Sequence, residues 1–374
     1  MLLFMDGQAH YASSDLARKY SNVNTASTAW AVVPEGRTAN CIRKTTLDNT
    51  NIGYLDISPL MTRLGPWAPT ASGVLGFAIM VDDLTRIRDT ILMPNVLVRI
   101  VEGNSYHLRV CLTQAGTFTL VRMDASEGSS GPLVLALSAE GIASGVWAYV
   151  EFKWVIANVT GMFEIRVNGV TVLTYAGRTY QSGLAWRALG LWDTVRLLEV
   201  ATDGIAPHVV IRISDLYLAD LAAPLATDVH DFLGDGTVVT ILPNAGGAVT
   251  GWTPSAAGGN WDQVNEPAPD DDATYVGATA PGTTDTYGYQ NIPGGAIVKG
   301  AHFNILARKE GDGSASLAPV YRQGGVDYVG PTQGVVSTAY DRYLTQPYDV
   351  NPATDAPFTD GEINGNEFGV RKVI

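Results

Sequence analysis

The chain has little cysteine and no long apolar run, and each shortage excludes a class of protein. Two cysteines, Cys41 and Cys111, are too few for a disulfide-stapled secreted scaffold. No Cys/His spacing indicates zinc. No stretch approaches the roughly 20 apolar residues of a membrane span, and the apolar run before Asp6 is too short for a signal-peptide core. We therefore expect a chain that is made and soluble in the cytosol. Its cysteines are predicted to be buried free thiols, with a single Cys41–Cys111 bridge as the open alternative.

Basic residues are also scarce. The 374 residues include 24 Lys and Arg against 37 Asp and Glu, a formal net charge of −13. This balance argues against a nucleic-acid binder that neutralises phosphates. The charge is uneven, because residues 1–222 hold 17 basic and 19 acidic side chains, whereas residues 223–374 hold 7 and 18. We therefore predict a domain boundary near residue 222, within the Ala- and Pro-containing spacer Ala219–Asp228.

What the chain does contain is glycine, proline and many short apolar runs. Hydrophobic residues make up 46% and charged residues 16%, with 40 Gly and 19 Pro, a balance typical of a folded, turn-rich β protein. Val146–Ala157 alternates apolar and polar residues with the period of a strand that has one buried face. Asn168-Gly169 stands between two apolar runs and predicts a type I′ hairpin.

Further strands and two short helical turns are predicted from the same signals. The first half is expected to contain strands at 74–81, 95–102, 106–112, 118–123, 133–138, 162–167, 170–175 and 209–218, with a turn of helix at Ser13–Lys19 and another at Asp82–Ile91. The second half is expected to contain strands at 237–242, 296–308, 318–322, 326–329 and 335–344, and a polar surface loop at 260–275. No repeat at a fixed period is present, so the pattern favours β-sandwiches over a solenoid or propeller.

Signatures of common catalytic and metal sites are missing. Neither GxSxG nor GxxxxGK[ST] occurs. The histidines are isolated in the sequence: His10, His107, His208, His230 and His302. Asp270–Asp272 is open to two interpretations, a solvated acidic loop or a cation site. Consecutive residues of an extended chain point in different directions, which favours the loop. We therefore predict no catalytic, cofactor-binding or metal-binding residues and no cofactor.

Several tryptophans are candidates for stacking on sugar rings. They are Trp67, Trp186, Trp192, Trp252 and Trp261. Trp30, Trp147 and Trp154 sit in strand-like runs and are expected in the core. Trp252 and Trp261 fall in Gly- and Pro-rich segments and are the better candidates for exposure, although packing over a sandwich edge is the favoured alternative.

Three segments of the first half resemble the laminin-G/concanavalin A-like jelly-roll superfamily, in the version found in tailed-bacteriophage virion proteins. They are Gly145–Phe152, Gly161–Val172 and Ile213–Asp220. The opening segments Gly7–Tyr11 and Leu16–Tyr20 are also similar to the start of such phage proteins. Relatives often have an Asp-Asp pair before Leu-Tyr, where this chain has Ser214-Asp215.

The second half extends the resemblance over nearly the whole chain. The similar segments are Leu233–Gly236, Leu242–Asn244 with Trp252, Tyr348–Asp360, Ile363-Asn364 and Glu367–Val370. The resemblance implies an all-β chain: an N-terminal concanavalin A-like jelly-roll sandwich at 1–222, then a second, smaller β-sandwich domain, acidic and Gly-rich, at 223–374.

The resemblance also implies a function, a structural component of a phage virion made in the bacterial cytoplasm. We expect a tail-associated role, as a minor tail, fibre or adhesion protein, with a capsid decoration protein as the alternative. Its expected partners are further copies of itself, as a trimer or other homo-oligomer, other virion proteins and host surface carbohydrate, with no nucleic acid and no membrane insertion. The start of the chain, Met1–Met5, is either a docking strand for a neighbour or the first strand of its own sandwich.

The same fold also hosts glycosidases, which cut with two carboxylates on one sheet face. Their signature is a strand with ExDxE or ExDxxE, and neither Glu151 nor Glu164 is followed by it. On that ground we expect no enzymatic activity, with a polysaccharide-degrading enzyme as the less favoured alternative.

Overall fold

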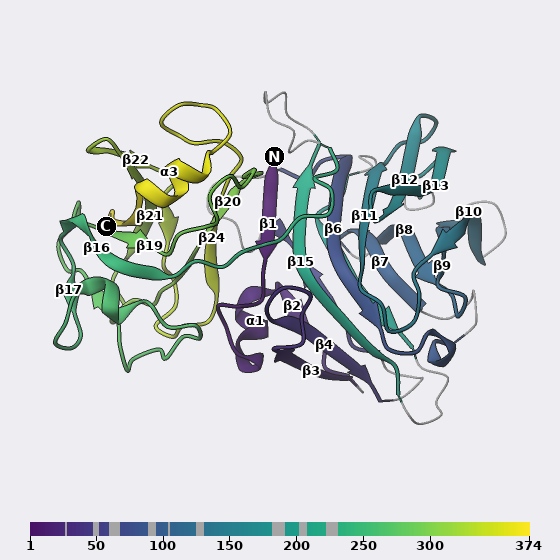
Figure 1. Cartoon of the computed structure of the whole chain (residues 1–374), viewed down its shortest axis with the longest axis horizontal. Helices are drawn as coiled ribbons and strands as arrows, with labels where there is room; N and C mark the ends of the chain where they lie inside the picture. Colours follow the sequence, from purple (N-terminus) through teal and green to yellow (C-terminus); the bar gives the residue numbers. More distant parts are fainter. Residues whose placement is uncertain are drawn as a thin grey trace.

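The computed structural model describes residues 1–26, 28–47, 52–59, 68–88, 95–103, 105–124, 131–181, 191–201, 208–221 and 231–374. Its strands pair antiparallel throughout, which confirms the predicted all-β class. Figure 1 shows two β-rich regions side by side, the sandwich (residues 1–221) and the C-terminal part (residues 231–374). No helix in these described ranges is long and apolar enough to cross a membrane.

Two antiparallel sheets make up the sandwich. Sheet A has the order β13-β12-β11-β6-β15-β4-β3, with β1 also paired to β15. Its strands are β1 (Leu2–Asp6), β3 (Thr28–Val33), β4 (Cys41–Thr46), β6 (Ser72–Val81), β11 (Ala148–Val155), β12 (Gly161–Val167), β13 (Val170–Gly177) and β15 (Val210–Asp220). Sheet B has the order β10-β9-β8-β7-β14-β5-β2. Its strands are β2 (Asn22–Val23), β5 (Leu55–Ile57), β7 (Asn95–Glu102), β8 (Ser105–Leu112), β9 (Thr117–Asp124), β10 (Gly131–Gly141) and β14 (Thr194–Val200).

The core of the sandwich lies between the two sheets. In β11, Val150, Phe152 and Trp154 are fully buried in it, and each such side chain contributes about 1.5–3 kcal/mol relative to exposure. The alternate residues of β11 face the outer side of sheet A, as the period of two predicts. The turn after β12 has positive φ at Asn168 (49°) and Gly169 (80°), which confirms the predicted type I′ hairpin.

The strands predicted in the first half are all present within a few residues of their expected ends. Ser13–Lys19 is helical as predicted, as a 3₁₀ turn (Ser13–Asp15) followed by α1 (Leu16–Lys19). The turn predicted at Asp82–Ile91 shortens to a 3₁₀ turn at Leu84–Arg86, and its predicted end lies outside the described residues.

The C-terminal part holds three smaller sheets and is less regular. The largest has the order β16-β19-β25-β21-β22, with β23 also paired to β21. Its strands are β16 (Pro243–Thr250), β19 (Thr284–Tyr289), β21 (Ser316–Gln323), β22 (Val326–Val329), β23 (Gln333–Gly334) and β25 (Glu367–Lys372). The others pair β17 (Thr253–Pro254) with β18 (Val276–Gly277), and β20 (Ala301–Leu306) with β24 (Tyr343–Tyr348). A 3₁₀ turn (Asn260–Gln263) and α3 (Asp360–Gly365) complete it.

One strand prediction in this half is wrong, and two are confirmed only in part. Residues 237–242 are unpaired, only 301–306 of the predicted strand 296–308 is a strand, and most of 335–344 precedes β24. The apolar residues of 237–242 suggested a strand, but no neighbouring strand pairs with them, whereas 301–306 pairs with β24.

Residues 231–242, here called the connecting segment, run from the sandwich into the C-terminal part and lie against the outer face of sheet A. The Leu233 amide donates to the Tyr217 hydroxyl (3.1 Å), the Gly234 amide to Glu151 (2.9 Å) and the Val238 amide to Asp215 (2.9 Å). The predicted domain boundary falls just before this segment, at residues outside the described ranges, so the division at 222/223 stays a prediction.

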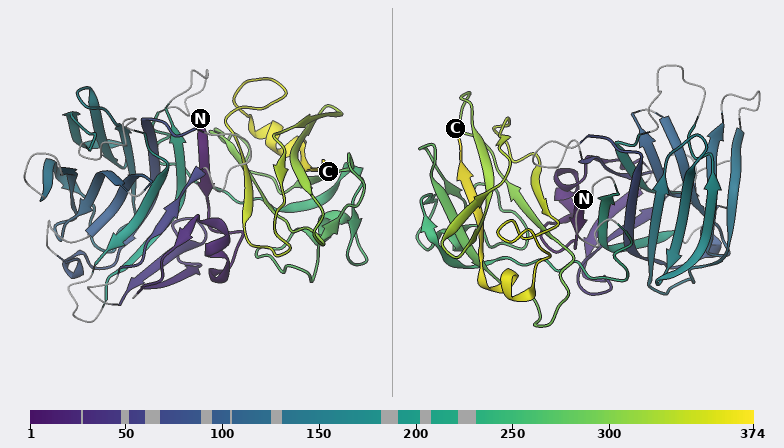
Figure 2. Two further views of the ribbon diagram at one scale, coloured as in Figure 1. Left: turned by 180° about the vertical axis from the view of Figure 1, so that it is seen from behind. Right: turned by 90° about the horizontal axis from the view of Figure 1, so that it is seen from above.

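Strand β1 lies where the sandwich meets the C-terminal part, and the views in Figures 1 and 2 agree on this. It pairs with β15 of sheet A, which confirms that Met1–Met5 contributes to its own sandwich. It also contacts the C-terminal part, because the Leu2 amide donates to Asp349 (2.5 Å). The Lys19 ammonium of the following helix donates to Asn304 (2.5 Å).

Candidate functional site

A row of arginines crosses the outer face of sheet B. The register places Arg196 of β14 opposite Arg99 of β7, and Arg99 opposite Arg109 of β8. Residues directly opposite one another in an antiparallel pair share a face, so the three guanidinium groups stand side by side. Like charges in that position are mutually destabilising. A row of three therefore needs counter-charges nearby.

The three arginines differ in their partners. Arg196 is held by Asp56 of β5 in a bidentate pair, at 2.8 and 3.0 Å. Arg99 Nη2 lies 2.5 Å from Glu199 Oε2. Arg109 has no carboxylate partner among the residues that the structure describes. With two pairs neutralised, the row retains the charge of one guanidinium, that of Arg109.

An aromatic ring completes the row. Tyr106 of β8 lies under the Arg99 guanidinium, with 4.1 Å between Cζ and the ring centroid, and 5.6 Å from Cζ of Arg109. Both contacts are within the range of cation–π attraction. Tyr106 therefore fixes the positions of two guanidinium groups and offers a flat, half-buried surface beside them.

The arginine row is partly buried. Val96, Val101 and Val121 belong to the same face, are each at most 3% exposed, and lie outside the core between the sheets. Arg99 is 5% exposed. Burial, and then the nearby Arg99 charge, lower the pKa of Arg109. The Nε atoms of Arg99 and Arg109 are buried and have no hydrogen-bond partner in the described part of the chain. The two Nε–H donors are therefore unpaired in a buried position, where an unpaired donor costs free energy.

Cys111 stands on the same face, opposite Val96. Burial raises the pKa of its thiol to about 11, so it stays protonated at neutral pH and is a poor nucleophile. Burial also raises the pKa of Cys41 to about 11. Both are free cysteines, as predicted, and the alternative of a bridge between them is wrong.

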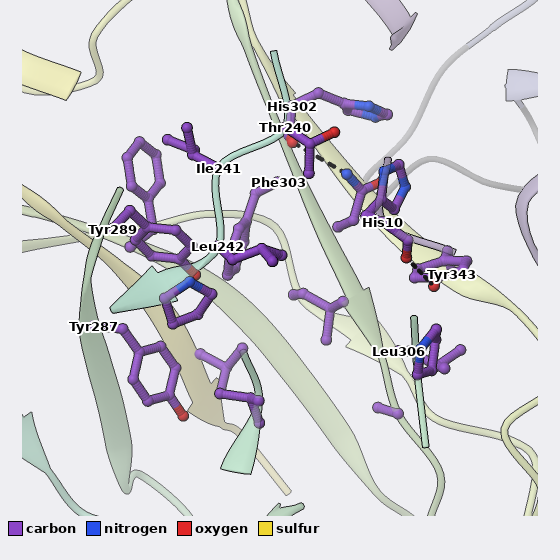
Figure 3. A pocket seen from close by; sticks show the side chains of 18 of the residues that line it. His10, Thr240, Ile241, Leu242, Tyr287, Tyr289, His302, Phe303, Leu306 and Tyr343 are labelled. Carbon is purple, nitrogen blue, oxygen red and sulfur yellow. Dashed lines mark hydrogen bonds between the residues drawn. The ribbon is translucent and has the colours of Figure 1, made fainter. Parts of the chain in front are cut away.

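A second hollow lies between β1 and the C-terminal part (Figure 3). Its volume is about 1310 Å³, and its wall is rich in aromatic side chains, among them Tyr287, Tyr289 and Phe303. The labelled His10 enters it from the sandwich, beside Tyr343. Neither ring nitrogen of His10 has a hydrogen-bond partner in the described residues. Burial, and then the Lys19 charge, lower the pKa of His10 well below its usual value. The hollow combines aromatic and apolar surface with charged side chains in its wall, among them Asp270, Asp271 and Arg308.

Glu151, the carboxylate considered for glycosidase chemistry, has a structural role as a hydrogen-bond acceptor. It lies on the outer face of sheet A, is 1% exposed, and accepts hydrogen bonds from the Tyr217 hydroxyl (2.6 Å) and the Gly234 amide. The connecting segment covers it. Glu164 pairs with Arg166 at 2.9 Å and accepts from Thr171. Neither carboxylate faces an open groove.

The tryptophan candidates are less exposed than the sugar-stacking hypothesis requires. Trp252 packs against a buried cluster of the C-terminal part, and its indole N–H donates to the Thr283 carbonyl (3.3 Å). Trp261 is half-buried in the 3₁₀ turn at 260–263. Trp192 is fully buried, in edge contact with Trp154. Trp67 and Trp186 lie outside the described residues.

The acidic run Asp270–Asp272 is engaged with the protein. Asp271 forms a bidentate pair with Arg18, at 2.8 and 2.7 Å. Asp272 pairs with Arg308, and Asp270 accepts from the Thr274 hydroxyl (2.8 Å). The three carboxylates point to three different partners, as expected of consecutive residues.

The arginine row was missed in the sequence because its members are far apart in the chain. The available signal is modest: each arginine interrupts an otherwise apolar strand, as in NVLVRIVE, SYHLRVCL and TVRLLEV. Only the register of three strands shows that these interruptions coincide.

Comparison with known proteins identifies the fold and no family. No family model matches, and no curated protein matches. Among solved structures, the chain is similar to an alginate lyase, Aly36B, at 16% identity over 59% of this chain and 96% of that one, with a TM-score of 0.37. It is also similar to a marine alginate lyase from Aplysia kurodai (7%, 59% and 99%, TM-score 0.40). A third is a carbohydrate esterase from the Shiga toxin-encoding bacteriophage phi24B (12%, 59% and 98%, TM-score 0.35).

These neighbours are β-sandwich, carbohydrate-active proteins, in agreement with the predicted jelly-roll fold. At such low identity they assign no activity to this chain.

They do correct one expectation. The prediction of a non-enzyme is contradicted, because the similar structures are lyases and an esterase rather than members of a fold group without enzymes. The missing ExDxE signature concerns hydrolysis by two carboxylates. A lyase breaks the chain by elimination and an esterase removes an acyl group, so neither requires that signature.

Proposed function

We propose that this chain contacts polysaccharide through the outer face of sheet B, as a component of a tailed-phage particle that meets the host surface. The observation that supports it is the Arg109–Arg99–Tyr106 arrangement: donors without partners and an aromatic ring on two neighbouring strands, β7 and β8. Polar groups placed beside an aromatic surface are the usual means of binding a sugar. The hollow of Figure 3 is the weaker candidate because its lining is mostly apolar.

The phage assignment rests on the sequence resemblance, and the structure makes that resemblance coherent. Glu151, Asp215, Tyr217 and Gly234 come from separate segments of the resemblance, and they meet under the connecting segment. A tail-associated position is proposed, with capsid decoration as the alternative.

Binding is tested on the full chain by affinity electrophoresis in gels that contain bacterial surface polysaccharides and plant or algal polymers. We expect retardation by at least one polymer. Tyr106→Ala should weaken it, because the ring beside the arginines is lost. Tyr328→Ala, a matched change in the C-terminal part, should leave it unchanged. No retardation by any polymer, or equal loss in both variants, would contradict the proposed site.

The position in the particle is tested by quantitative mass spectrometry of gradient-purified virions. A few to a few dozen copies of the chain per particle support the tail. A number near that of the major capsid protein, or a simple fraction of it, supports decoration, and complete absence overturns the virion proposal.

A further inference from the structure

We infer that the ligand of the sheet B face is an acidic glycan, and that Arg109 and Arg99 together bind a sugar carboxylate. The inference rests on the proposed function and specifies the chemical class of its ligand. It follows from the charge, the geometry and the energetic cost of this one arrangement.

One positive charge on this face, that of Arg109, has no carboxylate partner among the described residues. Asp56 neutralises Arg196 and Glu199 neutralises Arg99, so a single bound carboxylate would neutralise the remaining Arg109. The guanidinium presents parallel N–H donors with the spacing of the two oxygens of a carboxylate. A neutral sugar supplies acceptors without charge. It would leave the positive charge of the half-buried Arg109 without a counter-charge.

The burial of these arginines strengthens the preference of the face for an anionic ligand. Arg99 is 5% exposed, and its Nε, like that of Arg109, is buried without a partner. Ionic hydrogen bonds in a poorly hydrated site are stronger than those at an open surface. The position of Arg99 is fixed by Glu199 and Tyr106, so little side-chain entropy is lost when the ligand binds.

The rest of the chain restricts where an acidic polymer can approach. Residues 223–374 hold 18 acidic and 7 basic side chains, whereas residues 1–222 hold 19 and 17. A polyanion is repelled by the C-terminal part and meets a nearly neutral sandwich. At physiological salt the repulsion is screened beyond about 8 Å, so contacts at the face itself determine binding.

The arrangement also has a stability signature. Arg99 and Arg109 lie opposite one another and repel, so replacing Arg109 should not destabilise the fold. If replacing Arg109 weakens ligand binding without lowering the free energy of unfolding, its role is in binding rather than in the fold.

The experiment compares polygalacturonate, alginate and polysialic acid with the same polymers after reduction of their carboxyl groups to alcohols. Binding to the full chain is measured at physiological salt. We expect the acidic polymer bound best to lose about tenfold to a hundredfold in affinity on reduction. Arg109→Gln should cause a similar loss with an unchanged or higher midpoint of thermal unfolding, and Arg109→Lys a smaller one. Arg43→Gln, which changes a half-buried arginine on sheet A that pairs with Glu35, is the matched control and should bind normally.

Each other outcome has a defined meaning. Equal binding of the acidic and reduced forms, unaffected by Arg109→Gln, overturns the inference and leaves the proposed function standing. Equal binding of dextran sulfate shows attraction to charge alone and also overturns carboxylate recognition. Binding of neither form of any polymer overturns the proposed function itself.

Discussion

The two outer faces of the sandwich bear similar residues in opposite states. On sheet A, Glu151, Asp215 and Tyr217 are buried, and each has hydrogen-bond partners supplied by the connecting segment or by a neighbouring strand. On sheet B, the arginine row is as deeply buried at Arg99, yet buried donors of Arg99 and Arg109 lack partners in the described residues. Both faces have a polar cluster on an apolar sheet, and only the number of satisfied groups differs.

The difference gives a rule for reading such folds. A buried polar cluster with every group satisfied is part of the structure, and its loss is expected to affect stability. A cluster with an unpaired charge and unpaired donors lowers the stability of the fold. Replacing its residues is expected to affect binding rather than stability. The sheet A cluster could be recognised from the resemblance in the sequence. The arginine row of sheet B could be recognised only from the register of the strands.

Glu151→Ala should have the largest effect on stability. It leaves the Tyr217 hydroxyl and the Gly234 amide without their acceptor and weakens the attachment of the connecting segment. We expect a loss of about 3 kcal/mol in the free energy of unfolding, measured by urea denaturation. Glu151→Gln keeps an acceptor and should lose less. A stability equal to wild type would mean that the sheet A cluster is not structural.

Lys44 gives the next largest effect, through pH. It is buried between the sheets, donates to the Leu198 and Val200 carbonyls, and burial lowers its pKa to about 7 from its usual value of 10.5. Between those values the unfolded chain binds more protons than the folded one. The free energy of unfolding should therefore rise with pH, at up to about 1.4 kcal/mol per pH unit. Lys19, whose pKa is lowered to about 8 by burial, adds the same trend above pH 8.

Urea denaturation at pH 7, 8 and 9 measures this slope. Lys44→Met should remove most of it between pH 7 and 8, where Lys19 contributes less. An unchanged slope in the variant would assign the pH dependence to other groups.

The ion pair between Arg18 and Asp271 should have a small effect. It connects the sandwich to the C-terminal part, but the Asp271 side chain is 40% exposed. Exposed pairs contribute roughly 0–1 kcal/mol and weaken in salt. Arg18→Ala should thus lower the free energy of unfolding by about 0.5 kcal/mol, with the difference from wild type shrinking in 1 M sodium chloride. A salt-independent loss well above that would indicate packing rather than charge.

Arg109→Gln should have the smallest effect on stability, within about 0.5 kcal/mol of wild type and on the stable side. This variant sharpens the comparison most, because removal of the charged group on the other face, in Glu151→Ala, is costly. The midpoint of thermal unfolding measures it. Marked destabilisation would place Arg109 among the structural groups, together with Glu151.

The sandwich could be predicted from sequence because its strands alternate clearly and are separated by turn residues. Asn168-Gly169 specifies its hairpin locally, so it needs no knowledge of the fold. The C-terminal part was predicted less well, since in runs such as 296–308 the extent of pairing depends on a distant partner, here β24, rather than on local pattern. The unpaired run 237–242 is apolar because it lines the hollow of Figure 3.

The candidate site could not be predicted for a related reason. Arg99, Arg109 and Arg196 become neighbours only through cross-strand register, which a one-residue slip would reverse to the opposite face. Glu151 and Asp215 were noticed as parts of a resemblance, but their role in holding the connecting segment depends on residues 83 and 23 positions away, respectively.

Strand β1 carries a consequence for how the chain folds. Leu2 pairs with Ala219, and Asp6 with Leu216, so the first strand of sheet A is separated by more than two hundred residues from the strand it completes. During synthesis β1 has no partner until nearly the whole sandwich has been made. Such long-range pairing slows folding, and an unpaired strand is open to pairing with other chains until then. Since β1 also contacts β24, the last step in closing the sandwich prepares the surface on which the C-terminal part docks.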